Sequence, residues 1–273
     1  DIRSTTRVGR HIVKDIGSAT RTRPRRARRA DHLQVASARQ RPDAALIAMT
    51  SRRRSGPAVG LLGGSFNPAH GGHRRISLFA MDALALDEVW WLVSPGNPLK
   101  PTAGMAPLAA RVASARRQTR RSRIRVTAIE RELGTRYTFD TLRALLRRYP
   151  RRRFVWLMGA DNLAQFHKWK EWRGIAKLMP IAVIARPGYD GAALASPAMA
   201  WLRQFRRPVS SLRGPERWSA PALVTLRFDP DTRSATAIRR ADPDWARTIG
   251  TRPARTLSLR DAVTHRIIPG TAA

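Results

Sequence analysis

A short apolar run that ends in two glycines is the feature that most constrains what this chain can fold into. Residues 59–62 are typical of a buried strand, and Gly63 and Gly64 then break the pattern. Glycine has no Cβ, so the backbone here can approach a ligand closely. His70 and His73 follow at the start of an expected helix, whose unpaired N–H groups and positive dipole end face the same place. This combination indicates a site for phosphate.

Strands and helices alternate along the rest of the chain. Apolar runs bounded by turn residues predict strands at 59–62, 88–93, 123–130, 153–158, 181–185 and 222–228. Apolar stripes and capping residues predict helices over about 73–86, from Pro107 onward, from an N-cap at Thr138 to Tyr149, around 166–169 and from Ser234 onward. We therefore expect an α/β, Rossmann-like fold of three layers, with a central and mostly parallel sheet.

Ligands of open parallel sheets bind beyond the carboxyl ends of the strands. Four loops are expected at that edge, namely 63–73, 94–100, 159–161 and 229–239, and their convergence predicts one active site. Neither a Walker A pattern nor G-x-G-x-x-G is present, so the motifs do not indicate a P-loop ATPase or a dinucleotide-binding dehydrogenase. The histidine pair has two other interpretations: a loop pair without a role, or two metal ligands. No carboxylate lies nearby in sequence to complete a metal site.

Two motifs carry a resemblance to a known family. Residues 63–73, G-G-S-F-N-P-x-H-x-G-H, resemble the signature of the H-x-G-H nucleotidyltransferase superfamily, in the variant of bacterial nicotinate-nucleotide adenylyltransferase. Residues 234–239, S-A-T-A-I-R, are similar to that family's S-S-T-x-I-R. The resemblance covers residues 57–241. It implies transfer of the adenylyl group of ATP to nicotinate mononucleotide in NAD biosynthesis, with Mg²⁺ held by the ATP phosphates and no metal site on the protein.

The resemblance implies an ATP site built from both motifs. His70 and His73 are its implied catalytic residues, and both donate hydrogen bonds to phosphate oxygens. The other implied ATP-binding residues are Gly64, Ser65, Phe66, Gly159, Asp161, Ser234, Thr236, Ile238 and Arg239. Some have a purely structural alternative, since Phe66 can pack in the core and Asp161 or Ser234 can cap a helix. The family's second serine is Ala235 here, which weakens ATP binding only if that contact uses the hydroxyl.

The resemblance also implies a site for nicotinate mononucleotide. Its implied residues are Asn97, Lys100, Tyr137, Thr138, Trp169 and Arg186. Trp169 would stack on the pyridine ring, with a core or surface tryptophan as the alternative, and Lys100 and Arg186 can instead face water. A nicotinate carboxylate only accepts hydrogen bonds, whereas the nicotinamide group brings two N–H donors. A pocket rimmed by N–H groups in a basic protein therefore favours the acid.

Related families share the first motif, so that motif alone does not identify the acceptor. Cytidylyltransferases carry a different second motif, which is absent here, and the pantetheine-phosphate enzyme has Thr where His70 stands. Acceptance of nicotinamide mononucleotide or of pantetheine phosphate remains an alternative. A nucleic-acid-binding protein on the same fold is a further alternative, which the intact histidine pair and the second motif argue against.

Charge is the most unusual property of the composition. The chain has 52 Lys and Arg against 19 Asp and Glu, a formal net charge of +33. An arginine-favouring host composition, a nucleic-acid partner and substrates with several phosphates all lead to such a balance.

There are no cysteines, so neither disulfides nor thiolate metal sites can form. No apolar run approaches the ~18 residues of a membrane span, and no secretory signal is visible, so we expect a cytoplasmic protein. The oligomeric state is left open.

The ends of the chain differ from its middle. Residues 1–55 contain fifteen Arg or Lys and four Asp, and no helical or strand period survives this density. We expect 1–54 to be a basic, disordered extension; a transit peptide and a true start at Met49 are two further interpretations. Residues 55–242 then form the nucleotidyltransferase domain. Residues 243–273 form a partly helical tail, with an apolar helical stripe near 257–268.

Overall fold

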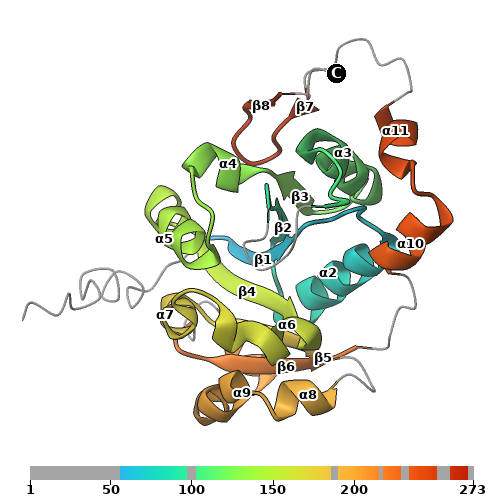
Figure 1. Cartoon of the computed structure of the whole chain (residues 1–273). Helices are drawn as coiled ribbons and strands as arrows, with labels where there is room; N and C mark the ends of the chain where they lie inside the picture. The colour runs from blue at the N-terminus through green and yellow to red at the C-terminus, as the bar shows by residue number, and fades with distance from the viewer. Residues whose placement is uncertain are drawn as a thin grey trace, which may run out of the picture. The chain divides into compact units, whose positions relative to one another are not determined.

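The computed structural model describes residues 56–96, 103–185, 190–214, 218–228, 234–250 and 259–269. The expected basic extension, 1–54, lies outside them. Six strands form one sheet in the order β3-β2-β1-β4-β5-β6, and every pairing in it is parallel (Figure 1). The strands are β1 (Ala58–Gly64), β2 (Glu88–Val93), β3 (Ile124–Thr127), β4 (Arg153–Gly159), β5 (Ile181–Ala185) and β6 (Leu223–Arg227). The predicted parallel α/β sheet is confirmed.

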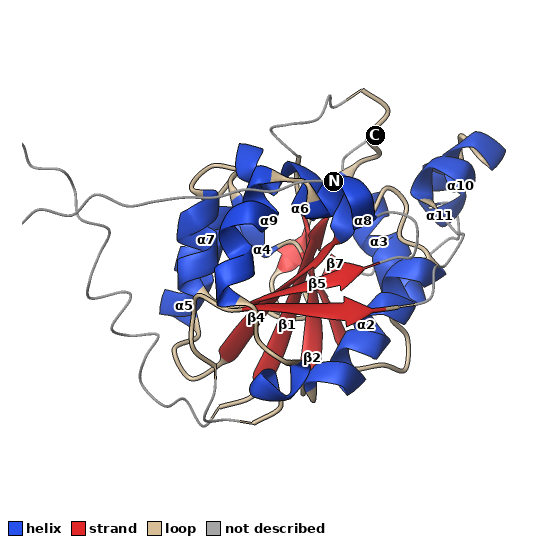
Figure 2. Cartoon of the chain, turned by 90° about the horizontal axis from the view of Figure 1, so that it is seen from below, coloured by secondary structure: helices blue, strands red, loops and turns tan. Residues whose placement is uncertain are grey.

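Helices cover both faces of this sheet, which gives three layers (Figure 2). One face is covered by α2 (Gly71–Leu84) and α3 (Leu108–Gln118). On the other face lie α4 (Ile129–Leu133), α5 (Thr138–Arg148), α6 (Ala160–Gln165), η1 (Phe166–Lys168), α7 (Trp172–Leu178), α8 (Asp190–Leu194) and α9 (Pro197–Leu202). The remaining elements are η2 (Arg203–Phe205), η3 (Val209–Leu212), α10 (Ala235–Ala241), α11 (Trp245–Gly250) and a hairpin of β7 (Leu259–Arg260) and β8 (Ile267–Ile268).

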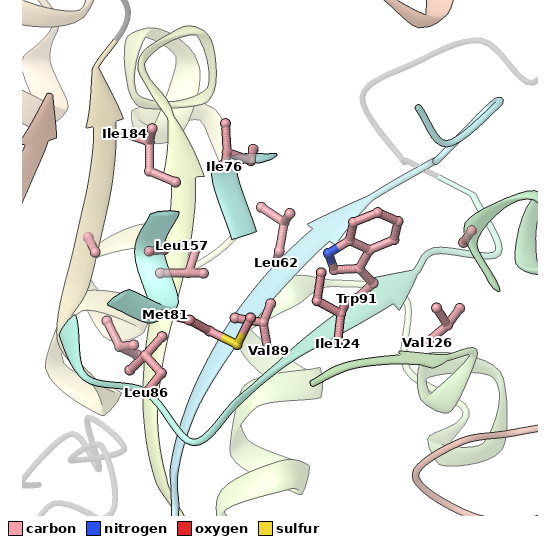
Figure 3. Packing of buried hydrophobic residues seen from close by; sticks show 14 of the residues in the cluster. Leu62, Ile76, Met81, Leu86, Val89, Trp91, Ile124, Val126, Leu157 and Ile184 are labelled. Atoms are coloured by element: carbon pink, nitrogen blue, oxygen red, sulfur yellow. The ribbon is translucent and has the colours of Figure 1, made fainter. Parts of the chain in front are cut away.

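Alternate side chains of each central strand enter opposite cores. Leu62 of β1 and Trp91 of β2 pack under α2, where they meet Ile76 and Met81 (Figure 3). Their neighbours Leu61 and Trp90 point into the other core, under α5 and α7. A central parallel strand has no face toward water, which is why these strands are continuous apolar runs in the sequence.

The strand order reverses between β1 and β4. From β1 the chain builds outward through β2 to β3, and it then returns to β4 on the opposite side of β1. In open α/β sheets, ligands bind beyond the carboxyl ends of the strands at such a reversal of the strand order. Residues 64–73 connect the end of β1 to α2, and α6 directly follows β4.

Several local predictions need correction. The strand predicted at 123–130 ends at Thr127, because the Thr127 hydroxyl accepts the Ile129 N–H at 3.1 Å and α4 begins there. Thr138 is the first residue of α5 instead of its N-cap, and Pro107 is the N-cap of α3 instead of a first-turn residue. In the part of the tail that the structure describes, 243–250 and 259–269, the helix is α11, and residues 259–268 of the predicted apolar stripe form the β7–β8 hairpin.

Candidate active site

The two histidines form the entrance of α2. His70 is the N-cap and His73 is the third helical residue. The Gly72 N–H donates to His70 Nδ1 at 3.2 Å, and the His70 N–H donates to His73 Nδ1 at the same distance. The two ring centroids lie 3.9 Å apart. The sequence prediction that both imidazoles meet at this helix end is confirmed, and the helix begins two residues before the predicted start.

These two hydrogen bonds assign the tautomer of each ring. A nitrogen that accepts a backbone N–H carries no proton, so in the neutral imidazole the proton is on Nε2. Each histidine therefore presents an Nε2–H donor beside the helix N-terminus. Donors of this kind suit the oxygens of a phosphate, and protonation at Nε2 does not suit metal ligation through that atom.

The loop between β1 and α2 is held by aromatic packing. Phe66 has φ +48° and is buried, with its ring stacked on Trp91 at 4.8 Å and tilted against His73 at 4.9 Å. A Cβ on Gly63 would lie 2.6 Å from the ring of Trp156. This glycine is therefore required by a neighbouring indole as much as by any ligand. The packing interpretation of the Phe66 side chain is correct, and its backbone N–H remains a proposed phosphate donor.

The second motif meets the first one in space. Ser234 caps α10, its hydroxyl accepting the Ala237 N–H at 3.1 Å. Arg239 of the same helix donates to the carbonyl of Asn67 at 2.5 Å and to Thr236 Oγ1 at 3.3 Å. Ile238 is half-buried on the same helix. Residues that are 172 positions apart thus lie at one place, and a guanidinium group stands beside the loop that leads to the histidines.

Gly159 and Asp161 lie where β4 turns into α6. Gly159 is the N-cap of that helix, and the exposed Asp161 stands in its first turn. The cap interpretation of Asp161 is not borne out, because α6 has no side-chain hydrogen bond at its cap. Its carboxylate instead lies against the backbone of Gly159, 2.4 Å from where a Cβ would stand. A larger residue at 159 would therefore require the exposed Asp161 side chain to move.

A second cluster gathers the residues implied for the acceptor. Tyr137 and Thr138 stand at the start of α5, and Trp169 ends η1. Lys170 joins the two, with its Nζ 3.0 Å from Asp140 and 4.8 Å from the centre of the Tyr137 ring. Trp169 is half-buried and packs edge-on against neighbouring aromatic rings. The sequence analysis assigned no role to Lys170, because one more cation in so basic a chain carries little signal.

Three of the implied acceptor residues, Asn97, Lys100 and Arg186, lie outside the described residues. Within the described ranges, no group of three or more His, Asp or Glu side chains is arranged to hold a metal ion. No helix in the described part of the chain is long and apolar enough to cross a membrane.

Arg111 of α3 is the clearest residue that sequence reasoning missed. Its side chain is 1% exposed and donates to the carbonyls of Ser65, Ser94, Pro95 and Ala106. A signal was available, since 111 falls on the apolar stripe that joins Leu108, Val112 and Ala115. An arginine within such a stripe is expected to be buried, with hydrogen-bond acceptors around its guanidinium.

Glu130 lies close to this arginine and is also buried. Loss of water around the carboxyl raises the pKa of Glu130 to about 7, against the opposing effects of a hydrogen bond with Ser94 and the charge of Arg111. Burial likewise lowers the pKa of Arg111 to about 10, so its guanidinium stays charged at neutral pH. Both groups lie beside the segments that follow β1 and β2, since Arg111 bonds to Ser65 and Ser94 and Glu130 interacts with Ser94.

Comparison with known proteins agrees with this geometry. The sequence pattern of the cytidylyltransferase-like family matches residues 61–241. A protein of Erythrobacter litoralis named "Probable nicotinate-nucleotide adenylyltransferase" is 71% identical over 214 residues, which are 78% of this chain and 94% of that protein. A protein of the same name from a Bradyrhizobium strain is 49% identical over 68% of this chain and 97% of its own length.

A solved structure supports the fold. The nicotinic acid mononucleotide adenylyltransferase of Plasmodium falciparum, in complex with NaAD, aligns with a TM-score of 0.51 at 15% sequence identity. The alignment covers 67% of this chain and 83% of that one. With both motifs in place at the switch point of the sheet, the chain belongs to the nicotinate-nucleotide adenylyltransferase family of nucleotidyltransferases.

Proposed function

We propose that this enzyme transfers the adenylyl group of ATP to nicotinate mononucleotide, which yields nicotinate adenine dinucleotide and pyrophosphate in NAD biosynthesis. The observation that carries the proposal is the pair of Nε2–H donors at the N-terminus of α2, beside Arg239. The family relationship supplies the choice of substrates.

The chemistry requires positioning more than covalent catalysis. A phosphate oxygen of the mononucleotide attacks the α-phosphorus of ATP, and a new P–O bond forms as the bond to the bridging oxygen breaks. The electron pair leaves with pyrophosphate, so no covalent enzyme intermediate is needed. Negative charge spreads over the α-phosphate oxygens, and preorganised donors such as His70 and His73 stabilise it.

ATP enters this reaction as its magnesium complex. We propose that Mg²⁺ is held by the triphosphate, where it shields the charge of the leaving pyrophosphate. Ser65, Phe66 and Gly64 are proposed to offer backbone N–H groups, and Ser234, Thr236, Ile238 and Arg239 to hold the triphosphate from the second motif. Gly159 and Asp161 would then face the adenosine ribose.

The acceptor is proposed to bind along α5 and η1. Tyr137 and Thr138 line the site at the start of α5, and Trp169 stacks on the pyridine ring. Lys170 lies beside Tyr137 and is paired with Asp140, and we propose that it interacts with the acceptor as well. Asn97, Lys100 and Arg186 remain proposed partners of the mononucleotide, and the cytoplasm remains the proposed compartment.

One assay tests the proposal directly. Purified enzyme with MgATP and nicotinate mononucleotide should release pyrophosphate and form the dinucleotide. Parallel reactions contain nicotinamide mononucleotide, pantetheine phosphate, or CTP in place of ATP. Highest kcat/KM with pantetheine phosphate or with CTP would overturn the assignment, and equal efficiency with the amide would overturn only the acid preference.

A further inference from the structure

One side chain of α3, Arg111, contacts the described residues that follow both β1 and β2. Arg111 Nη1 donates to Ser65 O at 2.9 Å and to Ser94 O at 2.6 Å. Its Nε donates to Ala106 O at 2.8 Å, and Nη2 donates to Pro95 O at 3.2 Å. A planar guanidinium with donors in fixed directions can join these carbonyls at once, which a single ammonium cannot.

The same helix also holds the far end of the phosphate-binding loop, residues 65–69. Ser114 lies one turn after Arg111 and is buried. Its hydroxyl accepts the Ala69 N–H at 3.0 Å and donates to Arg111 O at 2.9 Å. Residues 65 and 69 are thus both tied to α3, and His70 follows immediately. Rotation or displacement of α3 would move the cap of α2.

Asn67, within the loop, also bonds to the segment that precedes α3. Its amide nitrogen donates to Gly104 O at 3.0 Å, and its amide oxygen accepts the Ala106 N–H at 3.1 Å. Ala106 therefore bonds to both Asn67 and Arg111. The loop is closed into a network that runs from β1 to the N-terminus of α3, with Arg111 at its centre.

A buried carboxyl group lies near Arg111. Glu130 of α4 is also buried and lies close enough to act on it electrostatically. A buried guanidinium is costly unless its N–H donors find acceptors, and four backbone carbonyls accept from it here. A group that is expensive to bury and makes four bonds to carbonyls of the site loops is suited to holding a conformation.

We propose that Arg111 is a positioning residue, which holds residues 65–69 in the conformation that binds ATP and places His70 and His73 against the reacting phosphate. Arg111 touches no substrate in this proposal, and it acts through the carbonyls of Ser65 and Ala106. The inference rests on the proposed function of the same site.

The test compares Arg111→Lys and Arg111→Ala with the matched variants Arg117→Lys and Arg117→Ala, since Arg117 is exposed on the same helix. Turnover with MgATP and nicotinate mononucleotide, ATP affinity by calorimetry and the unfolding temperature are measured for each. A loop displaced by about 1 Å costs roughly 100-fold in rate, so we expect a loss of about that size in kcat for both Arg111 variants. ATP affinity should fall in parallel, and the Arg117 variants should match the wild type.

Two further measurements separate positioning from general stability. Added methylguanidinium should restore part of the kcat of Arg111→Ala, because it can refill the cavity and bond the same carbonyls, and it should not change Arg117→Ala. Ser114→Ala, which frees the other end of the loop, should also lower kcat. Arg111 variants with wild-type kcat and ATP affinity would overturn the inference. It would also be overturned if kcat fell together with the unfolding temperature, while ATP affinity stayed unchanged and methylguanidinium restored no activity. A wild-type enzyme that binds ATP but turns over no nicotinate mononucleotide would instead contradict the proposed function.

Discussion

At the scale of single residues, His70 and His73 each have one structural task and one proposed chemical task. One ring nitrogen satisfies a backbone N–H at the start of α2, and the other nitrogen is thereby committed as a donor. The helix cap and the proposed phosphate site are built from the same two side chains. Substitution by alanine would remove both tasks together, so a more selective change is needed to test the chemistry.

Asparagine is that selective change. Its side-chain oxygen can replace Nδ1 as the acceptor at a helix N-terminus, but it has no group at the place of Nε2. We expect His70→Asn and His73→Asn each to keep the unfolding temperature and to lose at least about 100-fold in kcat, as the loss of a transition-state donor typically costs. Thermal unfolding and pyrophosphate release measure the two effects. Near wild-type turnover in both variants would refute the donor role.

Glu130 should make stability depend on pH. Its pKa in the fold, about 7, lies above the usual 4.5, so the unfolded chain releases this proton first. The contribution to stability is complete below pH 4.5 and is lost as the pH rises through 7, a difference of about 3 kcal/mol. We expect Glu130→Gln to remove this dependence. Urea unfolding at pH 5 and pH 8 measures it, and equal losses in wild type and variant would contradict the prediction.

Trp169 should affect the use of the acceptor and not the binding of ATP. Trp169→Ala is expected to lower kcat/KM about tenfold for nicotinate and nicotinamide mononucleotides alike, because both rings offer the same face for stacking. The KM for ATP should not change, and the preference for the acid should persist. Trp201→Ala, another half-buried indole on the same side of the sheet, is the control and should leave both acceptors unaffected. A change in ATP affinity alone would contradict this role.

At the scale of elements, the β7–β8 hairpin attaches the tail to the domain (Figure 1). Asp261 is buried, and one carboxylate oxygen accepts from the Thr127 hydroxyl and the Ala128 N–H at 2.9 and 2.7 Å. Its other oxygen accepts the N–H groups of Val263 and Thr264. The tail thus helps to end β3 and start α4, the helix that carries Glu130.

Asp261→Asn should therefore be costly. The amide group is isosteric, but its NH₂ must face one of two pairs of donors that the carboxylate accepts. An unpaired buried donor costs about 1–3 kcal/mol, so we expect a loss of about 2–3 kcal/mol in the free energy of unfolding. Asp244→Asn, an exposed change in the same tail, should cost less than about 0.5 kcal/mol. Equal effects of the two variants in urea unfolding would exclude the anchoring role.

At the scale of the whole molecule, the basic extension is not expected to contribute to catalysis. The family pattern matches residues 61–241, and the described part of the chain starts at residue 56. A chain that begins at Met49 should keep its kcat within about twofold and its unfolding temperature, because residues 1–48 have no apolar period to pack against the domain. Loss of folding or turnover on this truncation would show that the extension is needed.

The sequence by itself determined the features whose signals are local. Continuous apolar runs identify strands buried on both faces, so β2 and β5 have the predicted bounds. The two histidines stand three residues apart at a helix start, so their meeting follows from helix geometry alone. Short helices such as α7 and α9 were not predicted, because a helix of one or two turns shows too little periodicity to identify.

Only the tertiary structure decided which polar groups act over long distances. Among 52 lysines and arginines, composition could not single out Arg111 as the one that closes the site loops. Arg239 reaches Asn67 across 172 positions, and Asp261 ends β3 from 133 positions away. Such bonds form because buried carbonyls and N–H groups must find a partner once the sheet has assembled, and no local pattern records which partner the fold brings.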